Sequence, residues 1–124
     1  MQERLRILCV DADATGLMVR TVLLEKFGYE VIPATIGKRA IAIVASEEIN
    51  LAIVDRHLGT MTGKELIERM KKQQPGLRII LFSGAMQLSG GLDKVDRLLL
   101  KGEGPQRLAA LVRLLTDEKG ESAA

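Results

Sequence analysis

Four polar side chains in this chain each follow directly after a short apolar run, and together they suit the chemistry of phosphate. The four runs and the residues that follow them are RILCV before Asp11, LAIV before Asp55, RIILF before Ser83, and RLLL before Lys101. If the runs are parallel strands of one sheet, their carboxyl ends meet at one edge, where open α/β sheets bind ligands. Two carboxylates, a hydroxyl and an ammonium are the groups needed to hold a phosphoryl group and a divalent cation.

The elements that would position these side chains alternate along the chain. Short β-rich runs followed by longer helical patterns are typical of βαβ units around a parallel sheet. We expect strands over residues 5–10, 30–32, 50–54, 78–82 and 97–100, and helices over residues 14–27, 36–46, 62–73 and from 105 onward. The sequence therefore predicts an α/β fold with five strands.

Helix boundaries and faces follow from local signals. Thr35 is the expected N-cap of the second helix, and Thr62 with Glu65 matches the S/T-x-x-E capping box of the third. The first helix is expected to bury Leu17, Val22, Leu24 and Phe27, and the last helix to bury Leu108, Leu111, Val112 and Leu115. Between the fourth and fifth strands, paired glycines at 90 and 91 predict only a turn or two of helix near 92–95, because each costs roughly 1 kcal/mol in a helix interior.

Length and composition exclude several classes of protein. The 124 residues suit one domain, which we place at residues 1–117, with a flexible tail or linker start at 118–124. With 18 basic and 16 acidic residues and 2% aromatics, the chain carries no signal for binding nucleic acid directly. No apolar stretch approaches the ~20 residues that span a bilayer, so we expect no membrane segment. The lone Cys9 fits a reducing, cytoplasmic location.

From residue 5 to 116 the sequence resembles the receiver domains of two-component response regulators, whose best-known form is the CheY-like fold. The segment LAIVDRHLGTMTGKELIERM looks like the family's phosphoacceptor strand, loop and third helix. Asp55 matches the aspartate that takes the phosphoryl group, and Asp11 matches the first of the family's acidic pair. Ser83 matches the switch hydroxyl and Lys101 the lysine that contacts phosphoryl oxygens.

The resemblance implies a flavodoxin-like, doubly wound sheet in the order 2-1-3-4-5, with a shortened or irregular helix after the fourth strand. It also implies a signalling domain, not a turnover enzyme, in which Asp55 accepts a phosphoryl group from a sensor histidine kinase or a phosphotransfer protein. Ser83 would then move toward the phosphoryl group and change the surface that a partner reads. Magnesium would be held by Asp11, Asp55 and the backbone carbonyl of His57.

Three positions depart from the family's pattern. Ala12 stands where a second acid usually binds magnesium, which brings the metal affinity into question; Asp13 is a substitute ligand, or else simply the N-cap of the first helix. Gly102 replaces the proline that usually follows the lysine. Leu98 occupies a position that is often aromatic, so we expect a remodelled output surface.

Two other interpretations remain open at the level of sequence. VDADAT also looks like the first motif of haloacid-dehalogenase-type phosphatases, with Asp11 as nucleophile and Asp13 as acid. That interpretation leaves Asp55 and its loop unexplained, and no acidic pair follows Lys101. The second alternative is a pseudo-receiver, a binding module with the same fold that does not depend on phosphorylation, which Ala12 makes credible.

Overall fold

The computed structural model describes residues 4–56, 58, 61–84 and 95–123, with the backbone alone from residue 117. Five strands and four helices make up this part of the chain. The strands are β1 (Arg6–Val10), β2 (Glu30–Ala34), β3 (Leu51–Asp55), β4 (Arg78–Ser83) and β5 (Arg97–Leu100). The helices are α1 (Ala14–Lys26), α2 (Gly37–Ser46), α3 (Gly63–Gln73) and α4 (Pro105–Ala123).

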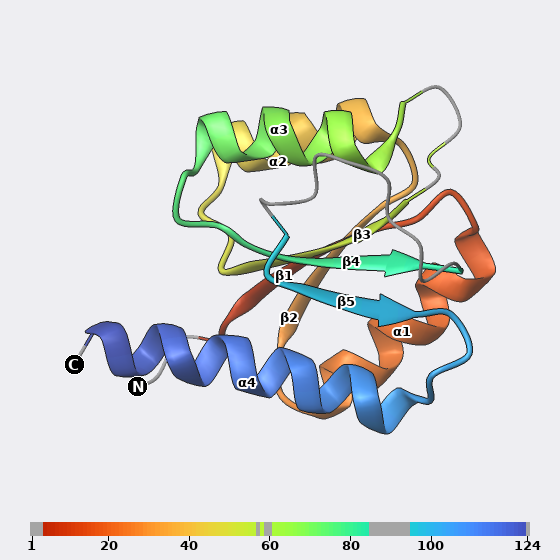
Figure 1. Ribbon diagram of the computed structural model, residues 1–124, viewed down its shortest axis with the longest axis vertical. Helices are drawn as coiled ribbons and strands as arrows, with labels where there is room; N and C mark the ends of the chain where they lie inside the picture. Colours follow the sequence, from red (N-terminus) through yellow and green to blue (C-terminus); the bar gives the residue numbers. More distant parts are fainter. Residues whose placement is uncertain (1–3, 57, 59–60, 85–94, 124) are drawn as a thin grey trace.

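The strands form one parallel sheet in the order β2-β1-β3-β4-β5, which confirms the predicted fold. Helices α2 and α3 cover one face of the sheet, and α1 and α4 cover the other (Figure 1). The central strand β3 is buried along its whole length. Because all five strands run in the same direction, their carboxyl ends share one edge of the sheet.

Side chains along each strand point alternately to the two faces of the sheet, so the core has two layers. In β1, Leu8 and Val10 pack on the α2 and α3 side, while Ile7 and Cys9 pack on the α1 and α4 side. The same two-residue period holds in β3 and β4, since successive side chains in a strand point to opposite faces. Both faces are therefore apolar, as a parallel sheet covered by helices requires.

Helix α1 buries a narrower face than the sequence predicted. Leu17 and Leu24 are buried as expected, but Val22 and Phe27 are 49% and 58% exposed. Leu17 and Leu24 are seven residues apart and so lie on one side of the helix, whereas Val22 and Phe27 fall outside that stripe. The prediction for these two residues was wrong.

The sequence predicted the N-cap residue of α3 correctly but not that of α2. Thr35 is not the N-cap of α2; Ile36 holds that position and makes no side-chain capping bond. The capping box of α3 is confirmed, because Thr62 Oγ1 accepts from the Glu65 backbone N–H at 3.1 Å and lies 3.2 Å from Glu65 Oε1.

Helix α4 carries the predicted buried stripe and runs further than expected. Leu108, Leu111, Val112 and Leu115 are all buried. The backbone stays helical to Ala123, across most of residues 118–124, for which the sequence predicted a flexible tail or linker start. None of the helices in the described ranges is long and apolar enough to cross a membrane.

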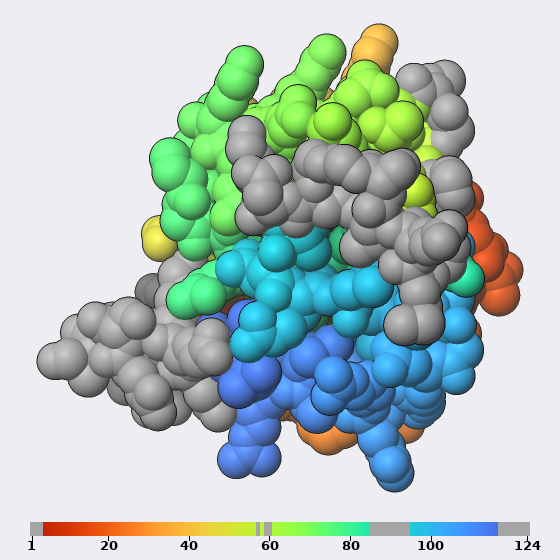
Figure 2. All heavy atoms as spheres, in the orientation of Figure 1, coloured from red at the N-terminus to blue at the C-terminus, as the bar shows by residue number. Residues whose placement is uncertain are grey.

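The edge strand β5 lies between two helices. Figure 2 shows its side chains (cyan) at the surface, between α3 (green) and α4 (blue). The short helix predicted near residues 92–95 falls almost entirely outside the described residues. Leu98 is half-buried in β5 and packs against the core on the α2 and α3 side.

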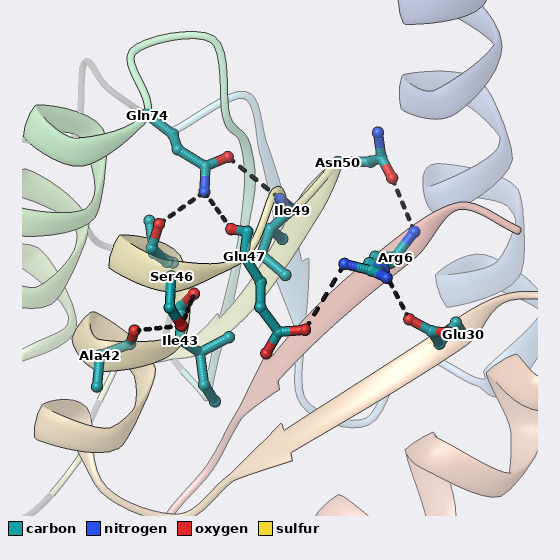
Figure 3. Close-up of polar contacts among 10 residues, drawn as sticks. Arg6, Glu30, Ala42, Ile43, Ser46, Glu47, Ile49, Asn50 and Gln74 are labelled. Atoms are coloured by element: carbon teal, nitrogen blue, oxygen red, sulfur yellow. Dashed lines mark hydrogen bonds and ion pairs between the residues drawn. The ribbon is translucent and has the colours of Figure 1, made fainter. Parts of the chain in front are cut away.

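Gln74 joins the amino ends of the sheet to two helices (Figure 3). Its Nε2 donates to the carbonyls of Val44 at 2.8 Å and Glu47 at 2.7 Å, and its Oε1 accepts from the Ile49 N–H at 3.2 Å. One side chain thus ties the C-terminus of α3 to the end of α2 and to the turn that enters β3.

Replacing Gln74 with alanine should lower the free energy of unfolding by about 1–3 kcal/mol, because three backbone groups lose their partner. Urea denaturation followed by circular dichroism measures this change. Gln73→Ala, at the exposed neighbouring position, is the matched control and should leave stability nearly unchanged. Equal effects of the two substitutions would contradict this role for Gln74.

Candidate functional site

Asp11 is held at the end of β1 by its own backbone and side chain. Its N–H donates to the Ala34 carbonyl at 3.1 Å, which extends the pairing of β1 with β2 by one residue. Its Oδ1 accepts from the Asp13 N–H at 2.8 Å, in the turn that leads into α1. The side chain is almost fully buried. A carboxylate is therefore fixed at the carboxyl edge of the sheet.

Asp55 ends the central strand and is equally buried. Its Oδ2 lies 3.1 Å from the Nζ of Lys101, which follows β5. The backbone around Asp55 is tightly packed: a Cβ on Gly63 would lie 2.9 Å from the Asp55 carbonyl oxygen. Glycine at the start of α3 thus lets that helix approach the end of β3 closely.

Ser83 lies beside Asp55 in the sheet. Asp55 is in register with Phe82 of β4, so Ser83 is one residue further toward the carboxyl edge. Ser83 is 1% exposed, and its carbonyl accepts from the Lys101 N–H at 2.7 Å. The chain thus brings Asp11, Asp55, Ser83 and Lys101 to one edge, as the four strand ends predicted.

The structure shows the local role of two residues at or near the positions that depart from the family pattern, Asp13 and Gly102. Asp13 is the N-cap of α1, accepting from the Thr15 N–H at 3.2 Å, and it is exposed. Gly102 has a φ of +103°, a left-handed conformation that proline cannot adopt. Ala12 is exposed. His57, whose carbonyl was an expected metal ligand, lies outside the described residues.

Arg20 belongs to the site although the sequence did not point to it. This residue of α1 pairs through Nη2 with Asp11 Oδ2, and its side chain is only 13% exposed. Its Cζ lies 4.5 Å from the centroid of the Phe82 ring, a distance at which a cation is attracted to the ring face. Arg20 is three residues after Leu17 and four before Leu24, so the spacing of the buried stripe could have revealed it.

Burial and the neighbouring Asp55 both affect the protonation of Asp11. Burial raises the pKa of Asp11 above its ordinary value of 3.8, and the hydrogen-bonded side chain of Asp55 adds to that rise. The Asp13 N–H and the Arg20 guanidinium act in the opposite direction without overcoming it. Burial likewise raises the pKa of the Cys9 thiol, to about 11, which keeps it protonated and unreactive.

The chain belongs to the response regulator receiver domain family, which it matches over residues 7–113. This match agrees with the observed strand order and with the acidic residues at the carboxyl edge. It does not support the alternative of a haloacid-dehalogenase-type phosphatase.

Individual relatives fit the same family. The chain is 30% identical over 77 residues to the transcriptional regulatory protein GlrR of Escherichia coli, covering 62% of this chain but 17% of that protein. It is 29% identical over 83 residues to sporulation initiation phosphotransferase F of Bacillus subtilis, covering 67% of each. The chain thus spans a small part of GlrR and two thirds of the phosphotransferase.

Solved structures agree with the fold. A CheY-like receiver domain protein from Methanospirillum hungatei matches with a TM-score of 0.91 and 31% identity, covering 97% of this chain and 99% of that one. The response regulator TrrA of Thermotoga maritima, solved in complex with Mg²⁺-BeF, matches with a TM-score of 0.84 and 24% identity, covering 90% and 98%.

Among the described residues of this site, three of the carboxylate oxygens that could bind a divalent cation are already engaged by protein groups. Magnesium requires nearly octahedral oxygen ligands. Here Asp11 Oδ1 is bonded to a backbone N–H, Asp11 Oδ2 to Arg20 and Asp55 Oδ2 to Lys101, while position 12 carries no carboxylate. Across the described part of the chain, no cluster of three or more acidic, histidine or cysteine side chains is arranged to hold a metal.

Asp11→Asn should stabilise the protein at neutral pH. Because the pKa of Asp11 is higher in the folded than in the unfolded chain, the protonated side chain contributes stability that is complete below 3.8 and lost as pH rises through the folded pKa. Asparagine keeps an oxygen for the Asp13 N–H and carries no charge. The melting temperature of Asp11→Asn should exceed that of wild type at pH 7 and converge with it toward pH 4.

Asp13→Asn, at the exposed N-cap, is the matched control for this titration. Asparagine is as good an N-cap as aspartate, so stability should stay within about 0.5 kcal/mol of wild type. A melting temperature for Asp11→Asn that falls below wild type across the whole pH range would contradict a raised pKa for Asp11.

Proposed function

We propose that this chain is a phosphoacceptor receiver domain in which Asp55 takes a phosphoryl group from a phosphohistidine of a sensor kinase or phosphotransfer protein. The observation that carries this proposal is the geometry of Asp55: a buried carboxylate at the end of the central strand, 3.1 Å from a lysine ammonium. An Asp55 oxygen attacks phosphorus in line, the new P–O bond forms, and the P–N bond to the histidine breaks.

Lys101, after β5, supplies positive charge that offsets the negative charge of the transferred phosphoryl group. Its Nζ already contacts Asp55, and its side chain is 44% exposed, so the ammonium lies where an incoming phosphoryl group would meet it. A cation held there attracts the donor and stabilises the negative charge that develops on the transferred group. The family membership and the similarity to a protein named as a phosphotransferase support this role.

Ser83 supplies the readout of phosphorylation. Its hydroxyl is buried on the strand next to Asp55, and its carbonyl is bonded to the Lys101 N–H. Movement of Ser83 toward a phosphoryl group on Asp55 therefore displaces the backbone at the ends of both β4 and β5. A local change of charge becomes a change of surface for a partner to recognise.

The second candidate is a pseudo-receiver that binds its partner without phosphorylation. The Asp11–Arg20 ion pair and Ala12 favour it, because they remove two ligands that a metal-dependent receiver would use. Phosphorylation in vitro separates the two functions.

Incubation with acetyl phosphate or phosphoramidate should add one phosphoryl group to wild type, detected by intact mass, and none to Asp55→Asn. Hydroxylamine should remove the group, since it cleaves an acyl phosphate and leaves a serine phosphate intact. Asp13→Asn is the control and should still be modified, which also separates this function from a phosphatase using Asp13 as acid. A wild-type chain that stays unmodified with both donors would favour the pseudo-receiver.

Ser83→Ala should accept the phosphoryl group but lose the conformational response. In wild type, phosphorylation should shift the amide resonances of residues 82–84 and 97–101 in heteronuclear NMR spectra. In Ser83→Ala these shifts should shrink, because no hydroxyl remains to bond the phosphoryl oxygen. Ser46→Ala, at the far end of α2, is the control and should respond like wild type. Undiminished shifts in Ser83→Ala would rule out Ser83 as the switch.

A further inference from the structure

Arg20 contacts residues in or directly after the two strands that flank the central strand. In the sheet, β3 is flanked by β1 and β4. Arg20 bonds Asp11, which follows β1, and also lies over the ring of Phe82 in β4. Lys101 pairs with Asp55, and its Nζ lies 5.6 Å from the centroid of the same ring. Each of the two carboxylates therefore has its own cation, and both cations lie beside Phe82.

Small residues at positions 12 and 16 accompany Arg20 and Asp11 in the sequence. Gly16 lies one turn earlier on α1, and a Cβ there would be 3.5 Å from Arg20 Nη1 and 3.0 Å from Asp13 Oδ2. A side chain at position 16 would therefore crowd the Asp13 carboxylate and touch the guanidinium. Position 12, next to Asp11, carries alanine in place of the second acid of the family. Compared with the family pattern, the site therefore has one acidic side chain fewer and one basic side chain more, Arg20.

The buried position of Arg20 carries a cost in stability. Its Nε is buried and has no hydrogen-bond partner among the described residues. An unsatisfied buried donor costs about 1–3 kcal/mol, and a buried ion pair is often no more stabilising than apolar side chains of the same size. A leucine or methionine at position 20 would extend the stripe of Leu17 and Leu24 and remove the unsatisfied donor, but it would also leave Asp11 without its cationic partner.

We propose that the Arg20 guanidinium takes the place of a divalent cation, so that Asp55 accepts its phosphoryl group without bound metal. This inference rests on the function proposed above. Phosphoryl transfer to a carboxylate needs positive charge beside the transferred group. Arginine is permanently charged, and its planar array of donors matches phosphoryl oxygens. With Arg20 and Lys101 present, the two acids are already balanced by two cations.

The first experiment measures metal dependence directly on the 124-residue chain. With acetyl phosphate as donor, Asp55 displaces acetate, and the rate of adduct formation should be the same in EDTA as in MgCl₂. Calorimetric titration with Mg²⁺ should show no binding at this site. An adduct that forms only with Mg²⁺, or Mg²⁺ binding that Asp11→Asn abolishes, would overturn the inference while leaving Asp55 as the phosphoacceptor.

The second experiment changes Arg20. Arg20→Met should slow phosphorylation by about 100-fold, the usual loss when one charge-stabilising group is removed, and Arg20→Lys should recover part of the rate. Arg69→Met, on the exposed side of α3, is the matched control and should behave like wild type. An unchanged rate in Arg20→Met would reduce Arg20 to a structural ion pair.

The third experiment restores an acid at position 12 and removes the base at position 20. Ala12→Asp combined with Arg20→Met restores the acid and removes the base, so this double variant should bind Mg²⁺ and depend on it for phosphorylation. Such a gain of metal dependence cannot come from a loss of folding. Failure of the double variant to bind Mg²⁺, although its circular dichroism spectrum is that of a folded protein, would count against the exchange. Absence of any adduct in every variant and condition would overturn the phosphoacceptor function itself.

Discussion

Two buried carboxylates in contact are the constraint on which this site depends. Asp11 and Asp55 each lie at a strand end with almost no access to water, and the side chain of Asp55 adds to the rise in the pKa of Asp11. Positive charge nearby lowers the free-energy cost of keeping the carboxylates ionised. In this chain the charge comes from two directions, with Arg20 on α1 and Lys101 after β5, so the helix layer and the edge strand are both tied to the site.

The fold gathers these groups by simple means. Five parallel strands place their carboxyl ends along one line, and the register of β3 with β4 puts Ser83 just beyond Asp55. Local backbone then adjusts the approach. Gly63 allows α3 to begin against the Asp55 carbonyl, and the left-handed Gly102 turns the chain immediately after Lys101. Each side chain of the site is thus carried by an element whose position the core determines.

The sequence predicted those features that depend on the spacing of apolar residues along an element and on the residues at its ends. Apolar runs ending in Asp11 and Asp55, the capping box at Thr62, and the stripe of α4 all follow local rules, and the structure agrees with them. The sequence did not predict the inner face of α1, because Val22 and Phe27 suggested a stripe that the fold does not use. Arg20 lies between Leu17 and Leu24 on the buried stripe, a position that becomes evident only once that stripe is identified. Its contacts with Asp11 and Phe82 are tertiary and do not follow from the sequence alone.

A tethered cation differs from an exchangeable one in what it makes the site respond to. A metal-dependent site gains and loses its charge with the concentration of the ion and with competing protons, since ligands must be deprotonated to bind it. A guanidinium stays charged over the whole physiological range and stays in place as long as α1 is folded. If Arg20 replaces the metal, phosphorylation of Asp55 is governed by the donor protein and by the packing of α1 on the sheet. The stability of that helix then becomes part of the signalling chemistry.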